Sequence, residues 1–368
     1  MLSTAIPKCS ISNEYVTFID QKHFKLLDGI RGLSIAAVIW HHSGGVYPIS
    51  SQFFGRGYLG VDMFFVLSGF LITFLLLKEK RITSTISLKK FYIRRTLRIF
   101  PLYFAFLGFI TIWESLSNPS DLPQILQAFP YYFFYISNWI PEAIEQYFKH
   151  AWSLAVEEQF YLIWPLLFAA IPMIRSVSLT IAFVIVVTIF EMGLFGQNLA
   201  LISWNFIPFR TLFLGCLLAI TLCNPFGYKI FFEIFKHGLF ISLVFILLIF
   251  SVARVDGPLT GVDLLTTHKL MVLFLAGAVI NEENILKSLL TFRPLKICGI
   301  VSYGVYILHG QFWGITQKIV GAIPFAGIAE SRITFFMVFL IISSSIAMLS
   351  YHFFESWFLR LKSRYGKY

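Results

Sequence analysis

Two ionisable side chains lie at the ends of one apolar stretch, RGLSIAAVIWHH, at residues 31–42. Eleven residues at 100° each make about 1,100°, about 20° more than three turns, so Arg31 and His42 share one face of a helix. They lie about 16 Å apart along its axis at 1.5 Å per residue. An arginine can hold an anion and a histidine can exchange a proton near neutral pH, so the pair could serve two ends of one reaction. The alternative is an interfacial arginine and a histidine satisfied by a neighbouring helix. His41, about 80° off the shared face, is expected to pack.

The stretch GYLGVDMFFVLSGFLI, residues 57–72, carries a second set of candidates. Asp62 would lie a short way below the outer membrane surface, where an ionisable group is expensive and usually functional. Ser68 and Gly69 are small enough to let another helix approach closely. We therefore take Asp62 and Ser68 as candidate substrate contacts, with a packing motif and a capping aspartate as the alternative.

A basic cluster follows in FYIRRTLRIFPLYF, residues 91–104. Arg94 and Arg98 would share a helix face, with Arg95 beside them. Guanidinium groups placed in this way can hold phosphates through charge-assisted, often bidentate hydrogen bonds. Ordinary anchoring at the cytoplasmic surface of a membrane is the alternative.

Two later stretches add an acid, hydroxyls and a histidine. HAWSLAVEEQFYLIWPLL, residues 150–167, places Ser153, Glu157 and Tyr161 at a four-residue spacing along one side of a helix. A carboxylate there could orient a histidine or take its proton, whereas an ion pair or a helix-entry charge is the alternative. GIVSYGVYILHG, residues 299–310, forms a polar stripe that is either functional or a structural hydrogen-bond ladder. Its members are Ser302, Tyr306 and His309.

The composition indicates that a membrane positions these stretches. Of the 368 residues, 57% are hydrophobic and only 13% are charged, whereas soluble domains carry about 25% charged residues. The net charge of +10 comes from short basic runs between apolar segments, which favours orientation signals over nucleic-acid binding. The four cysteines lack metal-ligand spacing, so no metal site is expected.

Eleven apolar segments approach the roughly 20 residues that a spanning helix needs. They lie near 28–47, 58–77, 99–117, 123–140, 153–173, 177–195, 205–223, 237–253, 265–281, 298–317 and 332–354. The basic loop 78–98 and the basic tail 360–368 should both be cytoplasmic, so an even number of spans separates them. Segment 123–140 is the weakest because it holds Pro130 and several polar residues.

Removing that segment predicts an all-α polytopic membrane protein with about ten transmembrane helices and both termini cytoplasmic. Residues 1–25 would form a cytoplasmic segment, 26–356 the transmembrane domain and 357–368 a basic cytoplasmic tail.

Together the stretches resemble the membrane-bound acyltransferase 3 family, whose members O-acylate carbohydrates and some other acceptors. The resemblance runs in family order over residues 26 to about 310, through LDGIRGLSIAAVIWHH, GYLGVDMFFVLSGFLI, RRTLRIFPLYF, WSLAVEEQFYLIWP and GIVSYGVYILH. It implies that Arg31 and His42 are the essential pair of the family, that the basic cluster lies near coenzyme A, and that Glu157 belongs to an acidic motif.

The resemblance therefore predicts an integral-membrane O-acyltransferase of a bacterial inner membrane. Acetyl-CoA would be the cytoplasmic donor, and a carbohydrate or lipid-linked glycan the acceptor. His42 would act as general base or acyl carrier, Glu157 would orient or charge-compensate it, and Arg31 would lie near the thioester. The donor phosphates would contact Arg94, Arg95 and Arg98. The expected substrate contacts are Asp62, Ser68, Trp152, Ser153, Tyr161, Tyr306 and His309.

Three alternatives stay open at this point. One is a transporter or flippase of a lipid-linked sugar, which also needs intramembrane charges. Another is a non-catalytic membrane partner of a glycan synthase, and the third is an acyltransferase that acts on a small molecule or a lipid.

Overall fold

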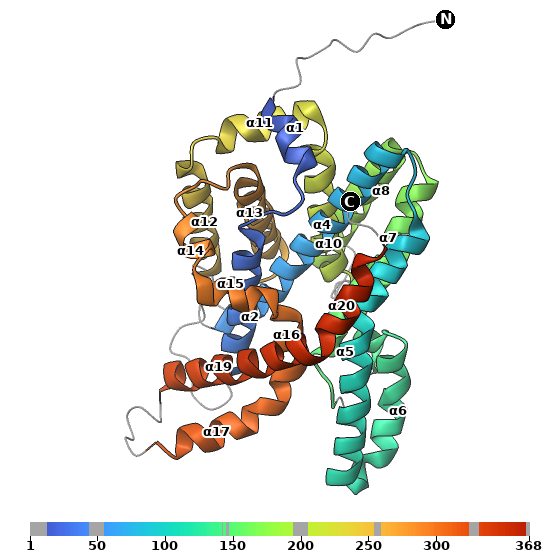
Figure 1. Cartoon of the computed structure of the whole chain (residues 1–368), viewed down its shortest axis with the longest axis vertical. Coiled ribbons are helices and arrows are strands. Elements are labelled where there is room, and N and C mark those ends of the chain that lie inside the picture. The colour runs from blue at the N-terminus through green and yellow to red at the C-terminus, as the bar shows by residue number, and fades with distance from the viewer. Residues whose placement is uncertain are drawn as a thin grey trace, which may run out of the picture.

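The computed structural model describes residues 13–43, 55–141, 143–144, 147–193, 205–253, 259–323 and 331–365. Every regular element in these ranges is helical, and Figure 1 shows helices that cross at several angles instead of forming one parallel bundle. The helices are α1 (Asn13–Asp20), α2 (Leu27–His42), α4 (Leu59–Thr83), α5 (Leu88–Ser117), α6 (Leu122–Phe133), α7 (Ala151–Ala170), α8 (Met173–Glu191), α10 (Ile207–Leu222), α11 (Pro225–Phe235), α12 (Leu239–Ala253), α13 (Gly261–Ile280), α14 (Lys287–Leu290), α15 (Arg293–Ile300), α16 (Ser302–Leu308), α17 (Trp313–Gly321), α19 (Arg332–Ser350) and α20 (Ser356–Ser363). Short 3₁₀ turns are η2 (Arg56–Tyr58), η3 (Pro119–Asp121), η4 (Ser137–Trp139) and η5 (His309–Phe312), and a π turn covers Tyr351–Glu355.

Several helical segments of the described residues are long and apolar enough to cross a membrane. These five are Arg56–Thr83, Leu88–Ser117, Met173–Glu191, Gly261–Ile280 and Arg332–Lys362. The consecutive helices α10 and α11 bend by 99° and add a sixth if the pair is one span. The chain thus has the apolar helices of a multi-pass membrane protein, but the predicted ten spans are not confirmed.

Short and broken helices account for much of this difference. Helices α2 and α12 have 16 and 15 residues, fewer than the roughly 20 that cross the hydrocarbon core. The segment 298–317, predicted as one span, is not one continuous helix: it is divided into α15, α16, η5 and α17. Segment 123–140 contains α6, of only 12 residues, which agrees with its exclusion from the spans.

Direct backbone contact between α2 and α15 fixes the position of Arg31. A Cβ atom on Gly299 of α15 would lie only 1.7 Å from the backbone oxygen of Asp28 on α2. Any side chain at position 299 would therefore separate the two helices. Asp28 in turn pairs with Arg31 at 3.1 Å, so the glycine contact and the arginine belong to one local structure.

A second close contact positions α4. A Cβ atom on Gly69 would lie 1.9 Å from the backbone oxygen of Leu212 on α10. The close helix approach predicted at Gly69 is therefore confirmed. Ser68, the residue before it, is consequently held on a helix whose packing leaves little freedom to shift.

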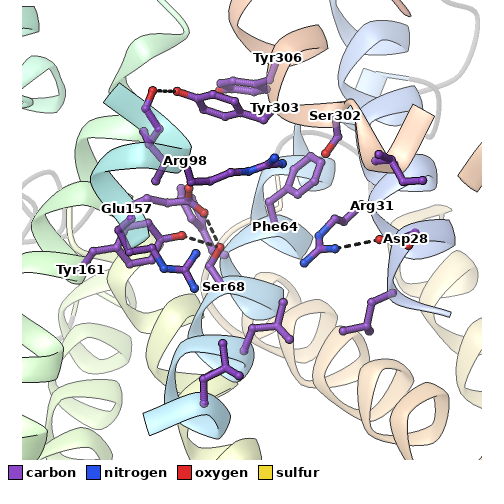
Figure 2. A pocket seen from close by; sticks show the side chains of 18 of the residues that line it. Asp28, Arg31, Phe64, Ser68, Arg98, Glu157, Tyr161, Ser302, Tyr303 and Tyr306 are labelled. Atoms are coloured by element: carbon purple, nitrogen blue, oxygen red, sulfur yellow. Dashed lines mark hydrogen bonds and ion pairs between the residues drawn. The ribbon is translucent and has the colours of Figure 1, made fainter. Parts of the chain in front are cut away.

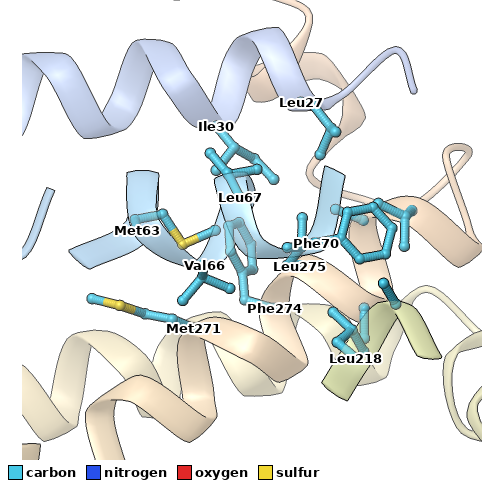
Figure 3. Close-up of a cluster of buried hydrophobic side chains, with 14 of the residues drawn as sticks. Leu27, Ile30, Met63, Val66, Leu67, Phe70, Leu218, Met271, Phe274 and Leu275 are labelled. Carbon is cyan, nitrogen blue, oxygen red and sulfur yellow. The ribbon is translucent and has the colours of Figure 1, made fainter. Parts of the chain in front are cut away.

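Helix α4 also runs through the largest apolar core. Figure 3 shows its side chains between those of α2 on one side and α13 on the other. Because lipid tails are as apolar as these side chains, close packing and not removal from water stabilises such contacts inside a membrane. The labelled members of this core are Leu27, Ile30, Met63, Val66, Leu67, Phe70, Leu218, Met271, Phe274 and Leu275.

The last helical segment, α19 to α20, ends beside α5. Helix α19 continues through the π turn into α20, which packs against α5 (Figure 1). Residues 357–363 of the predicted basic tail therefore belong to a helix. This packing brings Lys362 close to the basic cluster of α5.

Candidate functional site

A cavity of about 680 Å³ lies between α2, α4, α5, α7 and α16. Figure 2 shows Arg31 and Arg98 entering it from opposite sides, with Ser68, Glu157 and Tyr161 near one another. The predicted site residues that line it are Arg31, Ser68, Arg95, Arg98, Ser153, Glu157, Tyr161, Ser302 and Tyr306. Residues from five separate helices thus meet around one polar space, which agrees with a shared function for the motifs.

One end of the cavity is strongly basic. Arg95 stacks on the ring of Tyr161 with 5.3 Å between its Cζ and the ring centroid, and Arg98 lies 5.9 Å above the ring of Tyr303. These aromatic contacts orient the guanidinium groups without consuming their hydrogen-bond donors. Lys22, His23 and Lys362 also line the cavity and were not identified from the sequence. Such a set of cations suits a ligand with several phosphates.

Arg94 differs from the other two arginines of the cluster. Its Nη2 lies 3.5 Å from a carboxylate oxygen of Glu79, and both side chains are largely buried. Among the described residues that line the cavity, Arg94 is absent. Arg94 therefore pairs with Glu79 near the α4–α5 connection, apart from the cavity that Arg95 and Arg98 line, and donor binding by the three arginines stays a prediction.

The middle of the cavity contains a hydrogen-bonded chain of three residues. Ser68 donates a hydrogen bond to Glu157 over 2.6 Å and accepts one from the hydroxyl of Tyr161 over 3.1 Å. Glu157 also feels the positive charges of Arg95 and Arg31. The predicted contact between Glu157 and His42 is not present among the described residues: Glu157 accepts its hydrogen bond from Ser68, and the His42 ring contacts that of His309.

The other end of the cavity is formed by Tyr306 and Ser153, whose hydroxyl oxygens lie 2.6 Å apart. The Tyr306 hydroxyl also donates to the backbone oxygen of His150 over 3.0 Å. Ser153 and Tyr161 are eight residues apart on α7, so this end lies about 12 Å along the helix from Tyr161 and Arg95. The cavity therefore joins a cationic region to a hydroxyl-lined one.

Three histidines gather behind Tyr306. The ring of His309 lies 4.7 Å from that of His42 and 4.6 Å from that of His150, measured between centroids. His150 and Tyr306 are also in edge contact, with centroids 5.6 Å apart. His42 and His309 do not line the cavity themselves, and Tyr306 links it to them. His150 was missed from the sequence, although it is the first residue of the stretch 150–167 that contains Ser153.

Hydrogen bonds to backbone oxygens define the tautomers of these rings. Nδ1 of His42 lies 2.9 Å from the Val38 oxygen, and Nδ1 of His309 lies 2.7 Å from the Tyr306 oxygen. Nε2 of His150 lies 3.0 Å from the Ile307 oxygen. Because a carbonyl oxygen only accepts, each of these nitrogens carries the proton. A neutral His42 therefore keeps a lone pair on Nε2, the form that a general base requires.

Other predicted residues lie elsewhere. Asp62 lies outside the cavity wall and pairs with Nε2 of His268 at 3.2 Å. Trp152 packs its ring on Phe65 and is partly exposed, so it too lies outside the described cavity wall. His41 is exposed, and its Nδ1 lies 2.9 Å from the backbone oxygen of Gly55. Asp62 and Trp152, both predicted as substrate contacts, thus do not lie with the predicted residues that line the cavity.

The described residues contain no group of three or more histidine, cysteine, aspartate or glutamate side chains arranged to hold a metal ion. The three described cysteines are free thiols.

The helices and this site define a class: a helical membrane protein with a polar cavity between its helices. The chain belongs to the acyltransferase 3 family, since the family model described as "Acyltransferase domain" matches residues 24–352. It is 27% identical over 358 residues to the protein named O-acetyltransferase OatA of Staphylococcus aureus strain NCTC 8325. It is 30% identical over 360 residues to the protein named putative O-acetyltransferase SACOL0978 of Staphylococcus aureus strain COL. Each alignment covers 90% of this chain and 56% of the relative, so the chain spans about half the length of the curated relatives it matches. No solved structure matches it.

Proposed function

We propose that this protein transfers an acetyl group from acetyl-CoA to a hydroxyl group of a cell-surface or lipid-linked carbohydrate. The carrying observation is the cavity that joins the cations of one end to Tyr306 and the histidines behind it. Arg95 and Arg98 would hold the phosphates of the donor, with Lys22 and Lys362 nearby. The names of the related O-acetyltransferases support acetyl as the transferred group.

The proposed reaction places the acceptor at the histidine end. Nε2 of His42 removes the proton from the acceptor hydroxyl, and the resulting oxygen attacks the thioester carbonyl carbon. The C–S bond then breaks, the acetyl group stays on the oxygen, and the coenzyme A sulfur leaves and takes up the proton. In a covalent variant, Nε2 attacks the thioester first and carries the acetyl group to the hydroxyl.

The remaining residues would position these groups. Arg31 lines the cavity on the same helix as His42, and would polarise the thioester oxygen of the donor. Glu157 would offset the charge of Arg31 and Arg95 and hold Ser68 toward the ligand. Ser153 and Tyr306 would contact the acyl end of the donor or the acceptor.

The test uses the purified protein in lipid nanodiscs with carbon-labelled acetyl-CoA and surface polysaccharide from cells that lack it. Mass spectrometry should find a labelled acetyl increment on one sugar with the wild type and with His41→Ala. His42→Ala should lose the increment by about 10²–10⁴-fold, the range for a general base. Wild-type transfer by a normally folded His42→Ala variant would refute the assignment. Translocation of a sugar with no change in mass would instead favour the transporter.

A further inference from the structure

A second, apolar cavity lies on the opposite side of α2 and α4 from the proposed donor site. It is a groove of about 420 Å³ between these helices and α12, α13 and α19. Apart from Ser34 and Arg56, the side chains that line it are apolar. Ser34 already donates its hydroxyl to the backbone oxygen of Ile30, so the groove offers almost no polar contact along its length. A hydrocarbon chain is the chemistry that fits such walls.

The length of the groove matches one leaflet of a bilayer. Its walls include Ile30 and Trp40, which are ten residues apart on α2 and hence about 15 Å apart along the axis. That is about half of the roughly 30 Å hydrocarbon core of a membrane. Figure 3 shows part of these walls, where Ile30 and Met63 face Met271 and Phe274. The groove therefore suits one lipid chain from a single leaflet.

Two arginines lie at the Trp40 end. Arg56 lines the groove and donates to the backbone oxygen of Val252, which lines it as well. Arg332 stacks on the Trp40 ring, with its Cζ 4.4 Å from the centroid, and lies one helical turn before Phe336 of the groove wall. Its Nη1 is buried and has no hydrogen-bond partner among the described residues. Two guanidinium groups at one end of an apolar groove complement a lipid with an anionic head.

The same end adjoins the histidines. Arg332 donates to the backbone oxygen of Trp40 over 2.7 Å and to the hydroxyl of Ser43 over 3.3 Å, and these residues flank His41 and His42. The head group of a lipid bound with its phosphate at this end would therefore lie beside His42.

We infer that this groove binds the hydrocarbon chain of a phosphate-bearing acceptor lipid, with its phosphate against Arg56 and Arg332. The sugar attached to that phosphate is delivered to His42. Only this last step rests on the proposed acetyl transfer, since the binding of the chain and the phosphate follows from the groove alone.

Binding is tested first, without any reaction. A long-chain polyprenyl phosphate is added to the protein in detergent, and bound lipid is measured by native mass spectrometry. Leu248→Trp fills the groove, while Leu247→Trp places the same ring on the exposed, lipid-facing side of α12 and serves as the control. We expect Leu248→Trp and Arg332→Gln each to weaken binding about tenfold, and Leu247→Trp to leave it within about twofold. Equal binding in all four proteins, or equal binding of an uncharged polyprenol, would overturn the inference.

Transfer is tested second, with the same sugar presented either on polyprenyl phosphate or as a free saccharide. The lipid-linked sugar should have the lower KM, and Leu248→Trp should raise that KM without affecting the free saccharide. If the wild type binds polyprenyl phosphate but transfers no acetyl group, the proposed function fails and the groove inference stands. If transfer is equal for both sugars and unaffected by Leu248→Trp, the inferred delivery of the sugar from the groove to His42 fails and the proposed function stands.

Discussion

Neutralising the arginines of α5 one at a time separates the donor site from ordinary membrane anchoring. Arg95 and Arg98 line the cavity, whereas Arg94 pairs with Glu79 outside it. A hydrogen bond to a charged group contributes about 1.5–3 kcal/mol, so losing one phosphate contact should raise the KM for acetyl-CoA about 10- to 150-fold. We therefore expect Arg95→Gln and Arg98→Gln each to bind acetyl-CoA about 10- to 150-fold more weakly than the wild type. The melting temperature of both variants should change little.

The adjacent variant Arg94→Gln is the matched control. Its partner Glu79 is only 3% exposed and would lose its cation, so about 1–3 kcal/mol of stability should be lost. Its affinity for acetyl-CoA should stay within about threefold of the wild type, which is less than 1 kcal/mol. Titration calorimetry with acetyl-CoA and thermal unfolding in the same detergent measure both quantities. An Arg94→Gln variant that weakens acetyl-CoA binding as much as Arg95→Gln would refute the reasoning, because the cluster would then act through its total charge.

Two further predictions concern the helices that hold the site. Gly299→Ala should lower the melting temperature, because its Cβ would lie 1.7 Å from the Asp28 oxygen. The control Gly314→Ala, whose Cβ would meet nothing within 4 Å, should be neutral or stabilising by up to about 1 kcal/mol. Equal melting temperatures of the two variants would contradict the close packing of α15 on α2. His150→Ala should reduce acetyl transfer and stability together, because the buried Ile307 oxygen loses its donor at a cost of about 1–3 kcal/mol. His150→Gln, which keeps an N–H donor, should retain most of both, and an inactive but stable His150→Gln would show that the imidazole itself takes part.

The sequence predicted which helix faces carry polar groups, and much of the cavity follows from that. Arg31, Ser68, Glu157 and Tyr306 come from four distant motifs and all line one space. Intramembrane polar groups are costly in lipid, so they turn toward the protein interior, and their motifs could be expected to meet there. The small residue Gly69 likewise predicted a close helix contact, because only a missing side chain allows one.

The sequence could not predict the direction in which each helix is rotated. Arg94 and Arg98 are about 40° apart around a helix and Arg95 and Arg98 about 60° apart, so spacing alone favours the first pair as one face. The packing of α20 against α5 and the ion pair of Arg94 with Glu79 of α4 decide otherwise, since Arg94 turns to Glu79 and Arg95 lies on the cavity side. His150 was missed for a related reason: it precedes α7, and its contact with His309 depends on a break in the chain after α16 that hydropathy does not reveal.

The rotation of α4 shows why Asp62 belongs to a separate structure. Asp62 and Ser68 are six residues apart, which is about 600° or 240° around the helix, so they face different neighbours. Asp62 pairs with His268, which lies 3.4 Å from Arg210, and Arg210 pairs with Glu191, so α4, α8, α10 and α13 are joined by one buried polar network. A buried ion network of this kind contributes orientation more than stability, because its desolvation cost offsets much of its attraction. It fixes the face that α4 presents to the cavity, and Ser68 can meet Glu157 only while that rotation is held.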